Sequence, residues 1–165
     1  MIYAQIHAHS KFSVNQLSGE GVIHRYVWPI ERFIIKNLML SPERIYKKAK
    51  KLGLRFVCIT DHNTVPKIDK NLQDVLIPSE EWGQKKGHAN FISLSEPIDP
   101  DEGFFKKFKP KDPNNFLNAF EKAKKQGAFI VINHPFKRDS WLWGEDSYSY
   151  ADAIEIWNGP WNSEN

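Results

Sequence analysis

Two stretches of the chain repeat one pattern of hydrophobic and polar positions. In the first, apolar residues recur at helical spacing between Ser41 and Gly53, lysines take most of the outer face, and the apolar run 55–60 follows at once. Serine at the N-cap followed by proline is typical of a helix start, and glycine is typical of a helix end. The stretch 112–132 has the same order, with Gly127 before its apolar run. Each stretch therefore predicts a helix, a closing glycine and a buried strand.

The two apolar runs predict a sheet that is covered on both faces. Residues 56–59 and 129–132 are continuously apolar and do not alternate with polar residues. This pattern is expected where both faces of a parallel sheet are covered, so we predict the α/β class, as a barrel or a doubly wound sheet. Further strands are expected over 3–6, 74–77, 89–94 and 153–157, and a short helix near Pro29.

Composition places the chain among ordinary globular proteins. Its 165 residues suffice for one domain with a core but not comfortably for two, so we expect a single domain over 1–165. No apolar run approaches the roughly 18 residues of a membrane helix, which predicts a cytoplasmic protein with no membrane partner. The net charge of +3 does not by itself indicate a nucleic-acid partner. The lone cysteine, Cys58, lies in an apolar run, which argues against a zinc finger.

Residue types that bind metals recur where the predicted strands end. Five of the six histidines take part in this pattern. The strand ends carry His7-Ala8-His9, Asp61-His62-Asn63, Glu80-Glu81 and Asn133-His134, and His88 begins the strand between the last two. In a parallel α/β protein this end of the sheet is where active sites are built.

The spacing and the number of these histidines strengthen the prediction of a metal site. His7 and His9 are two residues apart on a strand, so both imidazoles point to the same side and can bind one cation together. A single histidine at a strand end is more often a hydrogen-bonded surface or core residue, whereas five together favour a metal site. Glu81 is the better candidate for a carboxylate that bridges two ions. Asp61 is expected to orient a histidine from behind.

Other polar and aromatic residues have more ordinary interpretations. Lysines on the outer face of an amphipathic helix are normally solvated. Lys137 and Arg138 differ, because they follow His134 directly and could clamp a substrate phosphate. The tryptophans near strand ends are either core residues or the walls of a substrate cleft, and they are Trp82, Trp141, Trp143 and Trp157.

These residues resemble the motifs of the PHP (polymerase and histidinol phosphatase) superfamily. The matching segments are His7-Ala8-His9-Ser10, Ile59-Thr60-Asp61-His62-Asn63-Thr64, Glu81 with Gly87-His88, Asn133-His134-Pro135-Phe136, and Glu155-Ile156-Trp157-Asn158-Gly159. The resemblance implies a distorted (β/α)7 TIM-like barrel that binds two or three divalent ions, which would be Zn, Mn or Fe. The implied metal ligands are His7, His9, His62, Glu81, His88 and His134, with Glu81 bridging.

The chain departs from the superfamily pattern in three places. Val14 and Asn15 follow Ser13 where the family has Ser-Asp-Gly or a further histidine, and Ser79 replaces a glycine before Glu81. The closing Asp-x-His motif of the family does not occur before Asn165. The resemblance therefore implies a barrel that is incomplete at the C-terminus. We expect a 165-residue product to bind metal poorly and to be inactive, and a longer natural chain to be active.

The function expected on this basis is that of a metal-dependent phosphoesterase. The mechanism would be hydrolysis by a hydroxide that bridges two cations, acting on a small-molecule phosphate ester. The residues assigned to catalysis are Glu81, Asp61 and His134, and those assigned to the substrate are Lys137 and Arg138. Two alternatives remain open. One is hydrolysis of carboxylic or carbamic esters or amides on the same metals, and the other is a non-catalytic module that binds nucleic acid or a partner chain through Lys47, Lys48, Lys50 and Lys51.

Overall fold

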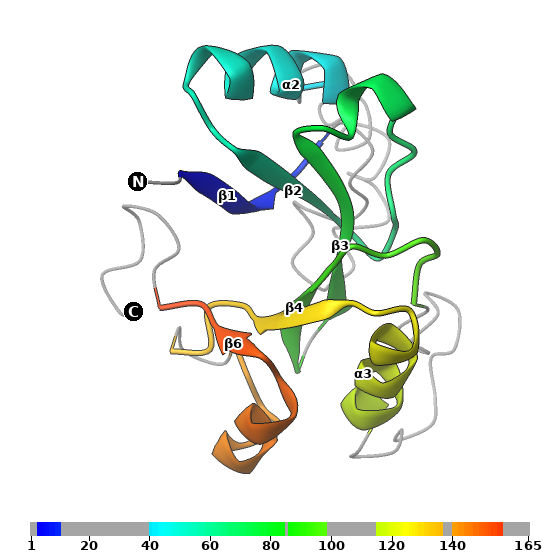
Figure 1. Ribbon diagram of the computed structural model, residues 1–165. Helices are drawn as coiled ribbons and strands as arrows, with labels where there is room; N and C mark the ends of the chain where they lie inside the picture. Colours follow the sequence, from blue (N-terminus) through cyan, green and yellow to red (C-terminus); the bar gives the residue numbers. More distant parts are fainter. Residues whose placement is uncertain (1–2, 11–39, 85, 99–114, 137–139, 157–165) are drawn as a thin grey trace, which may run out of the picture.

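A curled six-stranded sheet organises the molecule in the computed structural model, which describes residues 3–84, 86–98, 115–136 and 140–156 apart from 11–39. Its strands follow one another in sequence order across the sheet. They are β1 (Ala4–Ala8), β2 (Phe56–His62), β3 (Leu76–Gln84), β4 (Gly87–Ile92), β5 (Phe129–Ile132) and β6 (Ala153–Ile154). The curl brings the outer strands β1 and β6 to the same side of the molecule (Figure 1). The α/β class is confirmed, as a sheet curled into part of a barrel.

Strand β4 runs against its two neighbours, whereas the sequence led us to expect a parallel sheet. The pairs β1–β2, β2–β3 and β5–β6 are parallel, but β4 pairs antiparallel with both β3 and β5. The reversal follows from a tight connection between Gln84 and Gly87, which is far too short for a crossover helix. It also places the first residues of β4, including His88, beside the last residues of β3.

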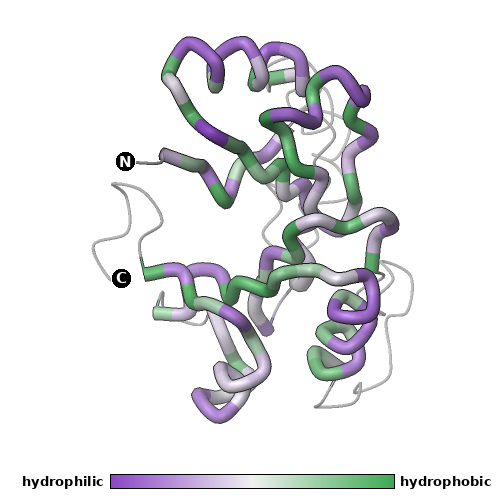
Figure 2. The backbone as a smooth tube through the Cα atoms, viewed as in Figure 1, coloured by the Kyte–Doolittle hydropathy of each residue, from purple (hydrophilic) through white to green (hydrophobic). Residues whose placement is uncertain are grey.

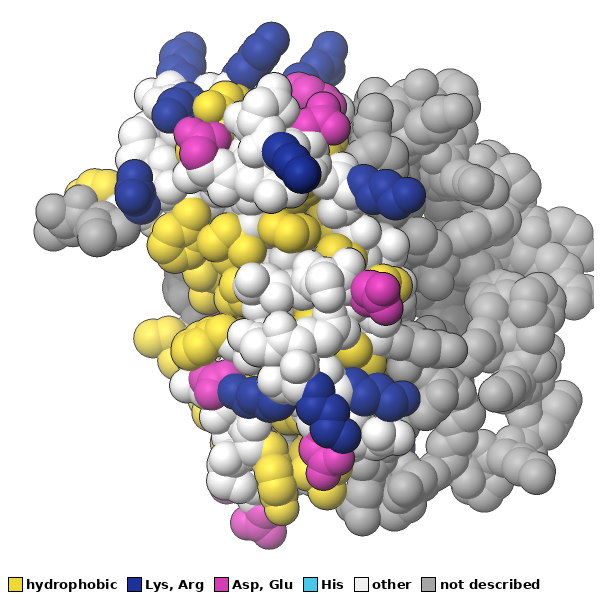
Figure 3. All heavy atoms as spheres, turned by 45° about the vertical axis from the view of Figure 1, so that its right-hand side comes forward, with side chains coloured by type: hydrophobic (Ala, Val, Ile, Leu, Met, Phe, Trp, Pro, Cys, Tyr) yellow, Lys and Arg dark blue, Asp and Glu magenta, His cyan; other side chains and the backbone are white. Residues whose placement is uncertain are grey.

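The helix α2 (Pro42–Lys51) forms where the sequence predicts it. Ser41 is its N-cap, and the Ser41 hydroxyl accepts a hydrogen bond from the backbone N–H of Arg44. Ile45 and Ala49 lie on the buried face and join the core cluster that contains residues of β2 and β3. The lysines lie on the exposed face, and basic side chains project from the surface at the top of Figure 3, with acidic side chains among them. This helix therefore covers the sheet with its apolar side only.

The helix α3 (Asn115–Lys125) carries the apolar stripe expected of it. Phe116, Ala119, Phe120 and Ala123 are all buried against the sheet. The helix start expected at residues 112–113, and the short helix expected near residue 29, lie outside the described residues. Two 3-10 helices are also present, η1 (Lys70–Leu72) and η2 (Glu145–Tyr150).

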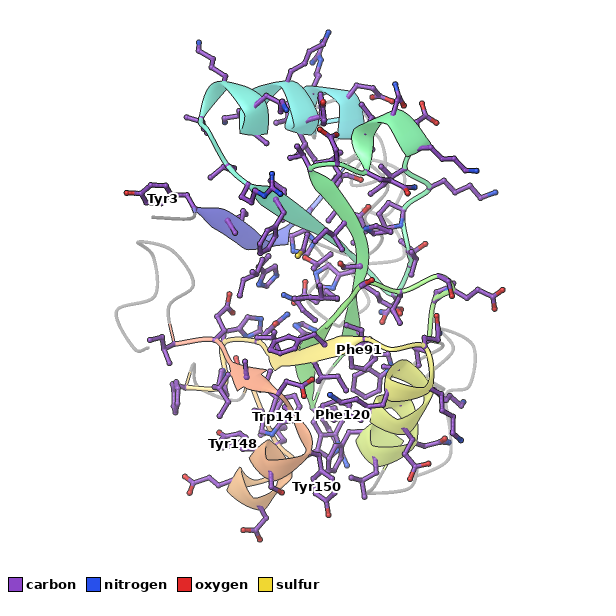
Figure 4. All side chains as sticks on the ribbon, in the orientation of Figure 1. Tyr3, Phe91, Phe120, Trp141, Tyr148 and Tyr150 are labelled. Atoms are coloured by element: carbon purple, nitrogen blue, oxygen red, sulfur yellow. The ribbon has the colours of Figure 1, made fainter. Side chains whose placement is uncertain are left out.

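Two hydrophobic clusters hold the sheet and helices together. One packs α2 and η1 against β2 and β3. The larger one is aromatic and lies between β4, α3 and η2, where Figure 4 labels Phe91, Phe120, Trp141, Tyr148 and Tyr150. Apolar colour follows the central strands in Figure 2, while the helices show hydrophilic stretches on their outer sides. No helix among the described residues is both long and apolar enough to cross a bilayer.

Candidate metal centre

Glu81 lies at the centre of the histidine cluster. It is only 1% exposed and lies inside β3, which continues three residues past it, so it does not end its strand as the sequence suggested. Oε2 of Glu81 lies near Nε2 of His7 (3.3 Å), Nε2 of His9 (3.1 Å) and Nε2 of His62 (3.1 Å). Oε1 of Glu81 lies near Nδ1 of His88 (3.3 Å) and Nε2 of His134 (3.6 Å). One buried carboxylate therefore contacts five imidazoles.

The five imidazoles form a ring around this carboxylate. Successive ring centroids are 5.1 Å apart for His7 and His9, 4.9 Å for His9 and His62, 5.2 Å for His62 and His88, 5.4 Å for His88 and His134, and 6.3 Å for His134 and His7. Two groups of three have donor atoms within 4.8 Å of one another, and they are His7, His9, Glu81 and Glu81, His88, His134. Glu81 belongs to both groups, as a bridging residue would.

Strand geometry delivers these side chains to one place. His62 is directly opposite Glu81 in the parallel β2–β3 pair. Asn63, which has a positive φ of 50°, then extends the pairing, because its side chain both accepts from the N–H of Gly83 and donates to the carbonyl of Gly83. His88 reaches the cluster only because β4 is reversed. Parallel and antiparallel pairing together build the ring.

A layer of polar side chains holds the cluster from outside. Oε1 of Glu155 is 3.1 Å from Nδ1 of His7, and Oε2 of Glu155 accepts a hydrogen bond of 2.9 Å from the backbone N–H of His134. The hydroxyl of Ser140 lies 3.2 Å from Nδ1 of His134. Nδ2 of Asn133 donates to Oε1 of Glu81 at 3.0 Å. Imidazoles that are oriented through their second nitrogen are typical of metal sites.

Sequence reasoning missed Ser140 and Glu155 as parts of this site. Glu155 did stand in the last of the motifs quoted above, within the strand predicted over 153–157, so its place in that motif was a usable signal. Ser140 carried no signal, because it follows no predicted strand and lies six positions after His134.

Asp61 is completely buried and is tied to the strand end that carries His9. Its two carboxylate oxygens accept hydrogen bonds of 2.6 Å from the backbone N–H and the hydroxyl of Ser10. We expected Asp61 to orient a histidine ring. The contacts with Ser10 fix the backbone next to His9, and the role of Asp61 in orienting a histidine stays a prediction.

Burial and crowding favour the neutral form of two of these imidazoles, His62 and His88. Burial lowers the pKa of His62 to about 4, with the neighbouring histidines adding to the effect and Glu81 opposing it. Burial likewise lowers the pKa of His88. For His7 the shift is in the opposite direction, because hydrogen bonds to Glu155 and Glu81 outweigh the effect of burial and raise its pKa to about 10. Glu81 stays ionised, since its histidine contacts outweigh burial and hold its pKa well below the usual value.

This donor set fits divalent cations. Neutral imidazole nitrogens and a carboxylate are ligands that Zn, Mn and Fe accept. Two ligands bound ~2.1 Å from a tetrahedral ion lie roughly 3.4 Å apart. The nitrogen-to-oxygen separations around Glu81, from 3.1 to 3.6 Å, match that spacing. The cluster therefore has both the chemistry and the spacing that metal ions require.

Of the remaining candidate residues, those that the structure describes lie outside the cluster. Lys137, Arg138 and Trp157 lie outside the described residues. Trp82 and Trp141 are buried in the aromatic core, whereas Trp143 packs against that core and also lines a cavity beside α3 and η2. Phe136 is 51% exposed.

The chain was compared with family models, with known protein sequences and with solved structures, and two solved structures have a similar fold. No family model matches the chain. An uncharacterized protein of Methanocaldococcus jannaschii is 26% identical over 162 residues, which are 94% of this chain and 81% of that protein. A two-domain protein of Bacteroides vulgatus, containing a predicted PHP-like metal-dependent phosphoesterase, has a similar structure with a TM-score of 0.56 and 23% identity. The match covers 94% of this chain and 44% of that one, so this chain spans less than half its length.

A second solved structure gives the same result. It is a protein of Bifidobacterium adolescentis that has been proposed to be a metal-dependent phosphoesterase, with a TM-score of 0.55 and 14% identity. The match covers 96% of this chain and 79% of that one. At such identities the likeness shows the fold alone.

Proposed function

We propose that this chain is a metal-dependent hydrolase that acts on phosphate esters. The observation that carries the proposal is the buried carboxylate of Glu81, which is shared by two groups of histidines. A shared carboxylate between two cation sites is the arrangement that a two-metal hydrolase uses. The PHP-like fold of the solved relatives supports the same conclusion.

The proposed ligands divide between the two groups. His7 and His9 would hold one ion, His88 and His134 would hold another, Glu81 would bridge them, and His62 would contribute from between His9 and His88. Bound divalent ions would lower the pKa of a water molecule and polarise a phosphate oxygen. The ions we propose are Zn, Mn or Fe, two or three in number.

The protein residues supply orientation and a buried negative charge. Glu81 is buried and ionised, so its negative charge stabilises cations in the cluster. Ser140 orients His134, and Asp61 fixes the backbone beside His9. Lys137 and Arg138 follow the cluster in sequence, and we assign them the role of neutralising a phosphate oxygen. Water is the proposed nucleophile, so no serine or cysteine is required.

Phosphate esters are favoured over carbonyl esters as substrates. A pocket walled by tryptophans would have supported hydrolysis of carboxylic or carbamic esters. Trp82 and Trp141 are instead buried in the aromatic core, where they cannot contact a substrate. The lysines of α2 lie on the outer surface of a helix, and a solvated face is the ordinary reason for such a pattern. A non-catalytic binding module is therefore the weaker alternative.

The test uses the variant Glu81→Gln. Gln keeps the size of the side chain but removes the charge that five imidazoles contact, so we expect the variant to lose bound metal. Elemental analysis and turnover of p-nitrophenyl phosphate, with p-nitrophenyl acetate for comparison, would be measured after incubation with Zn or Mn. Substituting a residue that only contacts a metal ligand lowers activity by up to roughly 100-fold. We expect the loss of phosphate-ester turnover in Glu81→Gln to be larger than that.

Glu96→Gln is the matched control, because Glu96 is an exposed glutamate outside the cluster. It should keep both metal and turnover. Unchanged metal content in Glu81→Gln would refute the metal centre. Metal binding with turnover of the acetate ester only would move the assignment to carbonyl esters.

A further inference from the structure

We propose that Glu155 is a positioning residue that sets the two halves of the histidine cluster relative to each other. The proposal rests on the metal centre proposed above and concerns a residue that contacts two of its histidines. Glu155 follows β6 and is only 8% exposed. One of its oxygens contacts His7 and the other contacts His134, and these two histidines belong to different halves of the cluster.

The first oxygen sets the orientation of His7. Oε1 of Glu155 is 3.1 Å from Nδ1 of His7, and Nε2 of the same ring is 3.3 Å from Oε2 of Glu81. A carboxylate can only accept, so without a cation Nδ1 of His7 donates to Glu155 and Nε2 donates to Glu81. A cation at the Glu81 side would replace the hydrogen on Nε2, while the hydrogen on Nδ1 would keep its partner Glu155 and fix the tautomer of the ring.

The second oxygen sets the backbone of His134. This residue has a φ of 32°, a region that residues with side chains rarely adopt. Oε2 of Glu155 accepts a hydrogen bond of 2.9 Å from its N–H, while Ser140 contacts Nδ1 of its ring. Glu155 thus helps to hold the unusual backbone, and Ser140 holds the ring, so that Nε2 of His134 faces Glu81.

A glutamine at this position could not make both contacts. The carboxylate meets two donors, Nδ1–H of His7 and N–H of His134, whereas a carboxamide has one accepting oxygen and one donating nitrogen. If the oxygen faces His134, the amide nitrogen faces His7 and favours the tautomer with hydrogen on Nε2. That tautomer turns a donor toward the cation position. If the oxygen faces His7, the backbone N–H of His134 loses its partner.

The experiment compares zinc affinity in the full chain. Zinc dissociation constants would be measured by competition with a chelator for wild type, Glu155→Gln and Asp152→Asn. Asp152 is the matched control, because it is an acid of the same segment that accepts from the backbone N–H of Ile130 at 2.7 Å and pairs with Lys124. We expect Glu155→Gln to bind zinc about 10- to 100-fold more weakly, and Asp152→Asn to stay within about threefold of wild type.

Equal zinc affinity in wild type and Glu155→Gln would overturn the role of Glu155 and leave the metal centre standing. Equal weakening in both variants would also overturn it, because the loss would then be one of general stability. If wild type itself binds no zinc, both the proposed function and this inference are refuted. These outcomes separate the two proposals.

A second measurement does not depend on the variant folding. Nitrogen-15 spectra of histidine side chains in zinc-loaded wild type report which ring nitrogen carries hydrogen. We expect hydrogen on Nδ1 of His7 and none on Nε2. Hydrogen on Nε2 of His7 would contradict the proposal directly, whatever the behaviour of Glu155→Gln.

Discussion

Asp61 accepts two hydrogen bonds of 2.6 Å from Ser10, one from the backbone N–H and one from the hydroxyl, in a completely buried position. Ser10 directly follows His9, and Asp61 directly precedes His62. A buried pair of hydrogen bonds therefore joins the ends of β1 and β2 where each strand delivers a histidine to the cluster. Its effect on both stability and metal binding can be measured.

Asp61→Asn should destabilise the fold and weaken metal binding. The amide keeps one accepting oxygen and turns a donor toward a donor of Ser10, which costs about 1–3 kcal/mol in a buried position. Chemical denaturation of the metal-free chain would give the free energy of unfolding, and elemental analysis would give the metal content. Asp74→Asn is the control, because the Asp74 side chain is 55% exposed, and its change should stay within about 0.5 kcal/mol. Equal stability of the two variants would contradict the prediction.

Gly83→Ala should disrupt the hairpin that places His88. Gly83 has a φ of +122°, and a Cβ built there would lie 2.1 Å from the carbonyl oxygen of Gly87. Backbone atoms cannot move aside as a flexible side chain can, so we expect the free energy of unfolding to fall by at least about 2 kcal/mol.

Gly53→Ala provides the comparison for that variant. Gly53 also has a positive φ, of +67°, but a Cβ there meets nothing within 4 Å, so only the conformational cost of about 1 kcal/mol applies. Thermal unfolding of both variants measures the difference. A Gly83→Ala protein as stable as Gly53→Ala would show that the hairpin can relax without cost.

The thiol of Cys58 should resist modification in the folded protein. Cys58 is 0% exposed, and burial raises its pKa to about 11 despite an opposing hydrogen bond with Ser79. At pH 8 only about one thiol in a thousand would be ionised at that pKa. A disulfide reagent should therefore react slowly with the native chain and fully after denaturation. Because the chain has one cysteine, the signal needs no separation of sites. Native labelling as fast as denatured labelling would be the contrary result.

Asp152 should make stability depend on pH in the acid range. Partial burial opposes its ionisation, but the N–H of Ile130 and the ammonium of Lys124 outweigh burial and hold its pKa below the ordinary value of 3.8. A lowered pKa means that the stabilisation is fully present above pH ~4 and is lost as the pH falls through the folded-state pKa.

Asp152→Asn should therefore be less stable than wild type at pH 6. The difference between their free energies of unfolding should become smaller as the pH drops below 4. Denaturant titrations at several pH values would measure it. Lys124→Met is the matched variant, since it removes the ion pair and keeps the hydrogen bond from Ile130, so its effect should be smaller. A gap that is independent of pH would refute this assignment.

Local pattern determined much of the fold. The helix that starts after Ser41 and the strand that follows it are confirmed, because capping, spacing and apolar runs act over a few residues. The same holds for the stripe of α3 and for β5. The sequence also named Glu81 and the five histidines that meet at it, since metal-binding residue types recurred at strand ends. Their role as ligands stays a prediction.

Only the tertiary structure decided how those strands are paired and what stands behind the histidines. A short run of apolar residues carries no direction, so the reversal of β4 could not be seen until Gln84 and Gly87 were found paired across a tight turn. The contacts of Glu155 with His7 and His134 join residues 148 and 21 positions apart. Hydrogen bonds over such separations depend on how the sheet curls and not on any local pattern. The sequence by itself therefore determined which residues could bind metal, and the fold decided which nitrogen of each ring faces the site.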